Sequence, residues 1–249
     1  KVFAVDQGGN AGSATVMAYT AGFPVDAAFH TRTEANQNRF WSGRLVGAKY
    51  LLSNSTAAEA SNAAWTFDSN TQYFNDYAAD TSYAYMFQRA PGFMDVVAYS
   101  GTGTNPLSVN HNLTVAPELM ITKRRNAAVS WHVGVPSISL GAFLNTADAF
   151  SSSRWTTDWA NFSPTSTIFK VSDGTAGSGD TMVAYLFATL AGVSKVGSYT
   201  GNAGYAVNVP CGFSNGARFI LIKRTDATAD WYVYDTVRGI TAGNDPYFF

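Results

Sequence analysis

Residues 219–235 read FILIKRTDATADWYVYD, and this stretch carries the pattern that decides the fold. An apolar run is followed by a polar connection and then by an alternating segment that begins at Trp231. Two β-prone runs joined by a few turn residues predict the strands of a β-hairpin. Residues 119–133 read LMITKRRNAAVSWHV, so the same pattern occurs 100 residues earlier, with Trp131 in the place of Trp231. The sequence therefore contains an internal repeat, which has to be recognised before a fold is assigned.

The repeat extends upstream of the hairpin in the same register. Residues 99–101 (YSG) correspond to residues 199–201 (YTG), and residues 85–87 (YMF) correspond to residues 185–187 (YLF). A third, weaker copy of the pattern opens the chain. The chain is therefore interpreted as consecutive copies of one structural unit.

We divide the chain into unit A (residues 1–94), unit B (residues 95–194) and unit C (residues 195–249), which holds only the first half of the pattern. Unit B has about eight β-prone segments separated by turn residues at intervals of about 8–12 positions, which is typical of a β-sandwich or jelly roll. The predicted fold class is all-β, with tandem lectin-like β-sandwich repeats of the concanavalin or jelly-roll type, each about 100 residues long. We expect helices to hold less than about 10% of the residues.

Unit C is predicted to form four strands, at residues 195–199, 205–209, 217–223 and 230–234. Half a sandwich would expose an apolar face and unpaired strand edges, which proteins normally cover. The apolar ending of the chain at residues 247–249 adds to this surface. We therefore expect unit C to be completed either by further residues of a longer chain or by another copy of this chain.

The composition narrows the functional classes. Charged residues make up 13% of the chain, about half the usual share, and the remaining surface is supplied by small and polar residues, as in β-rich extracellular or virion proteins. The net charge is −1 without a basic block, which argues against a nucleic-acid partner. The sequence has no apolar run long enough for a transmembrane helix, and the single Cys211 predicts no intrachain disulfide.

Several segments together suggest a family. Residues 199–202 (YTGN), 211–213 (CGF), 219–226 (FILIKRTD) and 231–239 (WYVYDTVRG) resemble a repeat family in tail-fibre-like virion proteins of marine and other tailed bacteriophages. Residues 52–59 (LSNSTAAE) are similar to the LxxNxTxAE segment of that family. The match is strongest in unit C and weakest in unit A, where Thr31 replaces the lysine and the Asp-x-x-Arg-Gly motif is missing.

The resemblance implies a lectin-like β-sandwich in a phage structural protein, but it supplies no ligand and no catalytic residue. The predicted function is therefore a non-enzymatic virion structural protein, part of a fibre or of a capsid or tail appendage, with a contribution to host-surface attachment. Its expected location is the virion surface, and its expected partners are other copies of itself or other virion proteins, with a host-surface glycan as a further partner. A carbohydrate-binding adhesin or lectin module is the alternative.

Catalytic patterns were sought as a test of the enzyme class. A serine hydrolase places its nucleophile in a strand–turn–helix context, whereas Ser178 lies in a glycine-rich loop between two predicted strands. A glycosidase needs two facing carboxylates, and the three glutamates, Glu34, Glu59 and Glu118, form no such pair in the sequence. We predict no catalytic residues, so a glycan-cleaving enzyme is the least favoured alternative.

The sequence also predicts no metal site and no cofactor. His30, His111 and His132 are too widely spaced for a recognisable ligand motif and have no cysteine partner. Asp173 and Asp180 flank a glycine-rich stretch that could suggest calcium, but such stretches are more often plain turns.

One segment is a candidate carbohydrate site. Trp155 and Trp159 lie in a stretch rich in Ser, Thr, Asp and Asn without a clear strand pattern. If these rings were exposed, they would stack on the face of a saccharide, while Asp158 and Asn161 would bond its hydroxyl groups.

The repeated hydrophobic positions are interpreted as core rather than as sugar platforms. We expect these side chains to be mostly buried: Trp131, Trp231, Phe87, Phe187, Ile121 and Leu221. The basic residues 123–125 are either a solvated hairpin connection or part of an ion pair with an acidic residue, of the Asp226 type, on an adjoining unit.

Overall fold

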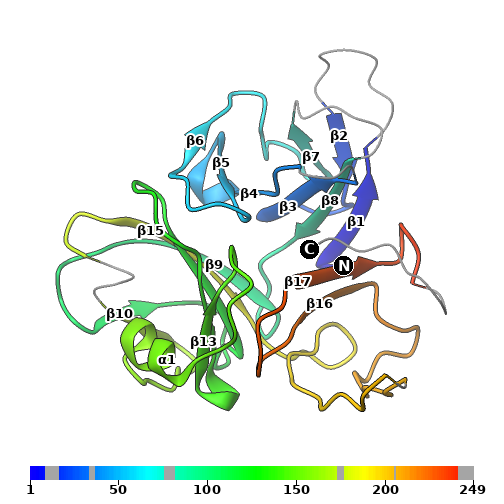
Figure 1. Cartoon of the computed structure of the whole chain (residues 1–249). Coiled ribbons are helices and arrows are strands. Elements are labelled where there is room, and N and C mark those ends of the chain that lie inside the picture. Colours follow the sequence, from blue (N-terminus) through cyan, green and yellow to red (C-terminus); the bar gives the residue numbers. More distant parts are fainter. Residues whose placement is uncertain (9–16, 34–36, 76–81, 173–176, 205, 241–249) are drawn as a thin grey trace.

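The computed structural model describes residues 1–8, 17–33, 37–75, 82–172, 177–204 and 206–240 (Figure 1). The described chain is predominantly β, which confirms the all-β class. In chain order the strands are β1 (Phe3–Gln7), β2 (Met17–Thr20), β3 (Ala27–Arg32), β4 (Phe40–Gly43), β5 (Lys49–Leu52), β6 (Ala60–Ser61), β7 (Gln72–Asn75), β8 (Ser82–Phe87), β9 (Met94–Ser100), β10 (Leu107–Asn110), β11 (Leu119–Arg124), β12 (His132–Val135), β13 (Leu140–Phe143), β14 (Ile168–Val171), β15 (Thr181–Phe187), β16 (Phe219–Lys223) and β17 (Trp231–Asp235). The helices of this part are α1 (Ser152–Trp159) and the 3-10 turns η1 (Arg44–Val46) and η2 (Pro136–Ile138), so the expectation of low helix content is confirmed.

Two large antiparallel sheets carry most of the strands. The first sheet has the order β1-β8-β3-β4-β5-β6, and the second has the order β9-β15-β11-β12-β13. A smaller pair of strands belongs to each, β2 with β7 in unit A and β10 with β14 in unit B. In both units the last strand lies between the first and the third, so the strand order of the two sheets corresponds from β1 to β5 and from β9 to β13. Unit C contributes the separate hairpin β16–β17, which lies beside unit A in Figure 1.

The central strands are apolar on both faces. In β8, Tyr83 and Tyr85 belong to one hydrophobic cluster, whereas Ala84 and Met86 belong to another. The side chains of strand β15 alternate in the same way. One set belongs to the cluster that contains Tyr83 and Tyr85, and the other belongs to a cluster inside unit B. Because successive side chains of a strand point to opposite faces, a strand covered on both sides needs a continuous apolar run.

Each large sheet therefore takes part in two cores. One face of each sheet is covered within its own unit, by β2 and β7 in unit A and by α1, β10 and β14 in unit B. The opposite faces of the two sheets pack together with the β16–β17 hairpin in one shared core. Aromatic side chains from units A and B meet there, with the ring centroids of Trp41 and Tyr185 4.6 Å apart.

The same contact joins unit B to unit A and unit C to unit B. Trp131 Nε1 donates a hydrogen bond of 2.7 Å to the carbonyl oxygen of Leu52, at the end of β5. Trp231 Nε1 donates one of 3.0 Å to the carbonyl oxygen of Phe143, at the end of β13. Each tryptophan thus anchors its hairpin to the end of the fifth strand of the unit before it.

A backbone hydrogen bond accompanies each tryptophan anchor. Glu59 N donates to Arg125 O at 2.7 Å, and Phe150 N donates to Thr225 O at 3.2 Å. The first junction adds a two-pronged ion pair from the Arg125 guanidinium to the Glu59 carboxylate, with N–O distances of 2.8 to 3.2 Å. Of the two interpretations of residues 123–125, Arg125 thus fits the ion pair with an adjoining unit, although its partner is a glutamate.

The prediction that six hydrophobic side chains are mostly buried is confirmed for three of them, but the other three are less buried than predicted. Trp131, Ile121 and Phe87 are buried. Trp231, Leu221 and Phe187 are only half-buried, because they pack at the margin of the shared core.

Two of the four strands predicted for unit C are absent from its described part. Residues 219–223 and 231–235 form β16 and β17, close to the predicted 217–223 and 230–234. Residues 195–199 and the described part of 205–209 carry no strand assignment. The corresponding strands β1 and β9 pair with β8 and β15, and no strand of that kind stands beside the hairpin among the described residues. The predicted contribution of residues 247–249 lies outside the described residues.

Candidate binding site

A cavity of about 240 Å³ lies where the three hairpins β3–β4, β11–β12 and β16–β17 meet. Three of its lining residues stand in corresponding positions of the three units: Phe29, Ile121 and Leu221. The registers support this correspondence, because Phe29 is paired with Trp41, Ile121 with Val133 and Leu221 with Val233. The cavity is therefore a product of the arrangement of the three units and belongs to none of them alone.

Both aromatic and polar side chains line the cavity. Trp41 and Trp231 both line it. Arg39 and Asp230 contribute opposite charges from two different units, and Asn54 and Asn145 contribute amides. Burial lowers the pKa of the Arg39 guanidinium, and the nearby Asp230 carboxylate acts against that shift. Flat apolar rings beside amide and charged groups form the type of lining that orients a small polar ligand.

Each of the two asparagines fixes a loop that lines the cavity. Asn54 Oδ1 accepts a hydrogen bond from Arg39 N at 3.1 Å, and Asn145 Oδ1 accepts one from Trp131 N at 2.8 Å. In units A and B, this hydrogen bond fixes the loop after the fifth strand to the start of the fourth strand. This gives a structural role to the asparagine of the LxxNxTxAE-like segment, whose Glu59 forms the junction with unit B.

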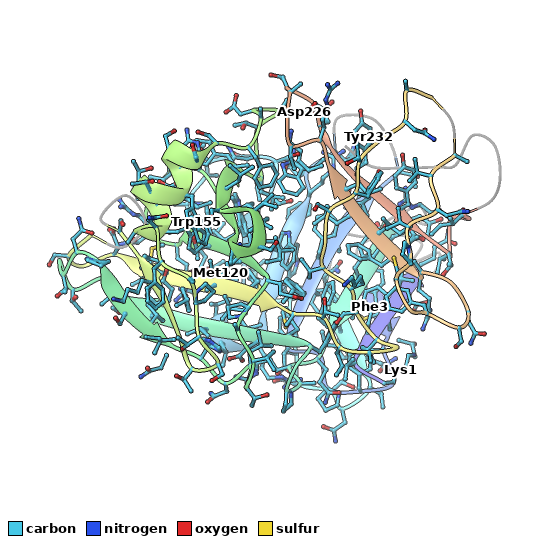
Figure 2. The ribbon with its side chains drawn as sticks, turned by 90° about the horizontal axis from the view of Figure 1, so that it is seen from below. Lys1, Phe3, Met120, Trp155, Asp226 and Tyr232 are labelled. Carbon is cyan, nitrogen blue, oxygen red and sulfur yellow. The ribbon has the colours of Figure 1, made fainter. Side chains whose placement is uncertain are left out.

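The structure places the predicted carbohydrate residues elsewhere, in and around α1. Trp155 is 2% exposed and Trp159 is fully buried, and both belong to the internal core of unit B together with Met120 (Figure 2). Asp158 is buried as well, and only Asn161 is exposed. The premise of exposed tryptophan rings was wrong, because both indoles are covered by protein and offer no free face to a sugar.

Local sequence explains why these tryptophans turn inward. Ser151 caps the helix by accepting a hydrogen bond from Ser153 N, so the segment forms a helix rather than a strand. Residues four apart lie on one helix face, which directs Trp155 and Trp159 together onto the sheet. The Trp159 indole lies directly over Gly134 in β12, where a Cβ atom would come within 2.6 Å of the ring.

Asp158 has a structural partner inside unit B. His132 Nδ1 lies 3.0 Å from Asp158 Oδ2, and Thr157 donates its hydroxyl to the other carboxylate oxygen at 3.0 Å. Burial would raise the pKa of Asp158, but these hydrogen bonds and the charges of His132 and Arg154 outweigh it and hold the pKa below its ordinary value. The pair thus ties α1 to β12.

The three histidines lie in separate surroundings. His30 is buried among aromatic rings, and burial lowers its pKa to about 3, so it is neutral at physiological pH. His111 faces the Thr165 carbonyl oxygen at 3.2 Å. Within the described residues, no group of three or more His, Cys, Asp or Glu side chains is arranged to hold a metal ion. Of the two residues considered for calcium, Asp173 lies outside the described residues, and Asp180 pairs with Arg124 at 2.6 Å.

Sequence reasoning missed the cavity because its residues are scattered over all three units. Trp231 was assigned to the core, and Trp41, Arg39 and Asp230 were not singled out. The signal that could have found them is the repeat itself, since three similar hairpins packed together bring their corresponding residues to one point.

A family described as a domain of unknown function (DUF7483) matches residues 81–245, about two thirds of the chain. The matched region starts at β8, the last strand of unit A, and includes all of unit B and the hairpin of unit C. No curated protein and no solved structure matches the chain. Among the described residues, no helix is long and apolar enough to cross a bilayer. Because the match covers more than half of the sequence, the chain belongs to the family of this domain of unknown function.

Proposed function

We propose that the chain is a non-enzymatic structural protein of a phage virion, part of a fibre or of a capsid or tail appendage, that contributes to host-surface attachment. In this proposal units A and B are tandem lectin-like β-sandwiches, and unit C is the beginning of a third. The resemblance of the repeat to tail-fibre-like virion proteins supports the virion location. The corresponding strand orders of the two large sheets support the tandem arrangement.

The observation that carries the proposal is the recurring junction between consecutive units. The hydrogen bond from Trp131 to Leu52 and that from Trp231 to Phe143 join different pairs of units through corresponding atoms. A contact that recurs between successive copies is the property of a building block, as in other repeat proteins in which each unit mainly contacts its neighbours. A chain whose recurring contacts serve the packing of units is suited to scaffolding.

The virion assignment is tested by the composition of purified particles. Phage particles from a lysate that contains this gene are banded by density gradient, and the band is analysed by mass spectrometry and by electron microscopy with gold-labelled antibodies against the chain. We expect peptides of the chain in the particle band and gold at a fibre or surface appendage. Finding the chain only in the soluble fraction, with none in the particle band, would contradict the proposal.

A carbohydrate-binding adhesin is the second candidate, and the cavity between the hairpins favours it. Trp231 is half-buried and lines the cavity together with Asp230 and Asn145, so an aromatic ring and polar groups border the same space. The volume of about 240 Å³ is slightly below the usual range of ligand pockets, which suits a single ring-sized group such as one sugar residue.

Glycan binding by the cavity can be measured directly. The purified chain and its Trp231→Ala and Asp230→Asn variants are applied to a glycan array, with circular dichroism as a check of folding. We expect the wild type to bind at least one glycan and both variants to lose about tenfold or more in affinity. Tyr199→Ala is the matched control, since Tyr199 is an exposed aromatic residue outside the cavity lining. Equal binding by all four proteins, or no binding by the wild type, would exclude this candidate.

A further inference from the structure

The outer edge of β16 differs from the corresponding edges in the other two units. Strand β3 pairs with β4 on one side and β8 on the other, and β11 pairs with β12 and β15. Among the described residues, β16 pairs with β17 alone. In the part of the chain that the structure describes, one edge of β16 therefore lacks the strand that both of its counterparts possess.

The residues that precede β16 also lack a partner strand. In units A and B the first strand pairs with the last, β1 with β8 and β9 with β15. The corresponding residues 195–200 of unit C form no strand, and residues 197–204 and 206–210 are all exposed. Within residues 195–200, Tyr199 is 50% exposed. The open edge of β16 and residues 195–200 therefore border the position that β8 and β15 occupy in the other two units.

The two complete sheets specify the residue that this position accepts. Tyr85 of β8 is paired with Phe29, and Tyr185 of β15 is paired with Ile121. The corresponding residue of β16 is Leu221. Both strands also alternate between apolar residues on their two faces, because they are covered on both sides.

We propose that the outer edge of β16 is a docking site for an extended peptide strand of the β8 and β15 type, with a tyrosine opposite Leu221. The incoming strand pairs with β16 on one side and orders residues 195–200 on the other, which completes the central part of a third sheet. Backbone hydrogen bonds supply the affinity, and the alternating side chains supply the specificity, as in other cases of strand addition to a sheet edge. The proposal concerns the purified chain and does not depend on the virion assignment.

The test uses the full chain and a synthetic peptide with the sequence of residues 177–190, extended by lysines for solubility and labelled with a fluorophore. Binding is followed by fluorescence anisotropy, and the docking position is followed by hydrogen–deuterium exchange. We expect saturable binding and new protection of amides in residues 195–200 and 219–223, with unchanged exchange in β11 and β12. A peptide with Tyr185→Lys is expected to bind about tenfold more weakly or worse.

Three outcomes would overturn the proposal. One is the absence of peptide binding by a folded chain. Another is equal binding of the peptide with a scrambled sequence, which would indicate nonspecific apolar association. The third is protection, without peptide, of the β16 amides that do not pair with β17, since the outer edge would then already be occupied.

Discussion

Replacing Trp131 by alanine is expected to lower the free energy of unfolding by about 3–5 kcal/mol. The indole is fully buried in the shared core, and its Nε1–H is the donor to the Leu52 carbonyl oxygen. The variant would therefore leave a cavity between the two large sheets and also remove a hydrogen bond that joins unit B to unit A. The change is measured by urea unfolding followed by circular dichroism.

Trp231→Ala is the matched comparison for this prediction. Trp231 makes the corresponding hydrogen bond to Phe143 but is only half-buried and borders the cavity. We expect a clearly smaller loss of stability, because fewer contacts disappear and solvent can fill the space. If the two variants were equally stable, the shared core would not depend on the deeper tryptophan and the prediction would be wrong.

Asp235→Ala is expected to destabilise the docked hairpin by about 3–5 kcal/mol, which is typical when one partner of a buried ion pair is removed. Asp235 is fully buried, accepts a 2.8 Å hydrogen bond from the Tyr85 hydroxyl and pairs with Arg238, whose side chain is 3% exposed. The variant leaves the Arg238 charge buried without its carboxylate. We expect faster proteolysis within unit C, with units A and B still protected, measured by trypsin digestion and mass spectrometry.

Arg224→Ala provides the control at the tip of the same hairpin. Arg224 pairs with Asp226 at 2.7 Å, but both side chains are exposed, and Figure 2 shows Asp226 at the outer surface. Exposed ion pairs contribute little to stability because water screens them and the side chains lose freedom when they pair. Apart from the loss of the tryptic site at position 224, we expect no measurable change in the rate at which unit C is digested. An effect as large as that of Asp235→Ala would show that the hairpin tip, and not the buried pair, holds unit C in place.

The sequence was sufficient to predict the elements that depend on local pattern. The hairpins β11–β12 and β16–β17 follow from apolar runs separated by turn residues, and the 100-residue spacing identified Trp131 and Trp231 as corresponding residues. Their hydrogen bonds to Leu52 and Phe143 agree with that correspondence. The spacing does not reveal which carbonyl groups these indoles meet, because those lie in other units.

The errors arose where structure depends on distant partners or on a short helix. Residues 195–199 have the composition of a strand, but a strand also needs a neighbour to pair with, and composition does not show whether the neighbour exists. The interpretation of Trp155 and Trp159 did not take the helix N-cap into account. Ser151, followed by two tryptophans four residues apart, indicates an amphipathic helix. The cavity could not be predicted because it arises only when three hairpins meet.

The position of β8 and β15 in their sheets has a consequence for how the chain folds during synthesis. Each strand is the last of its unit to leave the ribosome, yet each occupies the middle of its sheet, between the first and third strands. Phe3 pairs with Phe87, which lies 84 positions later in the chain. This part of the strand ladder can therefore form only after Phe87 has been synthesised. Pairings so distant in sequence carry a large loop-closure cost and slow folding. We therefore expect unit A to remain open until its final strand has emerged, and then to close in a single late step.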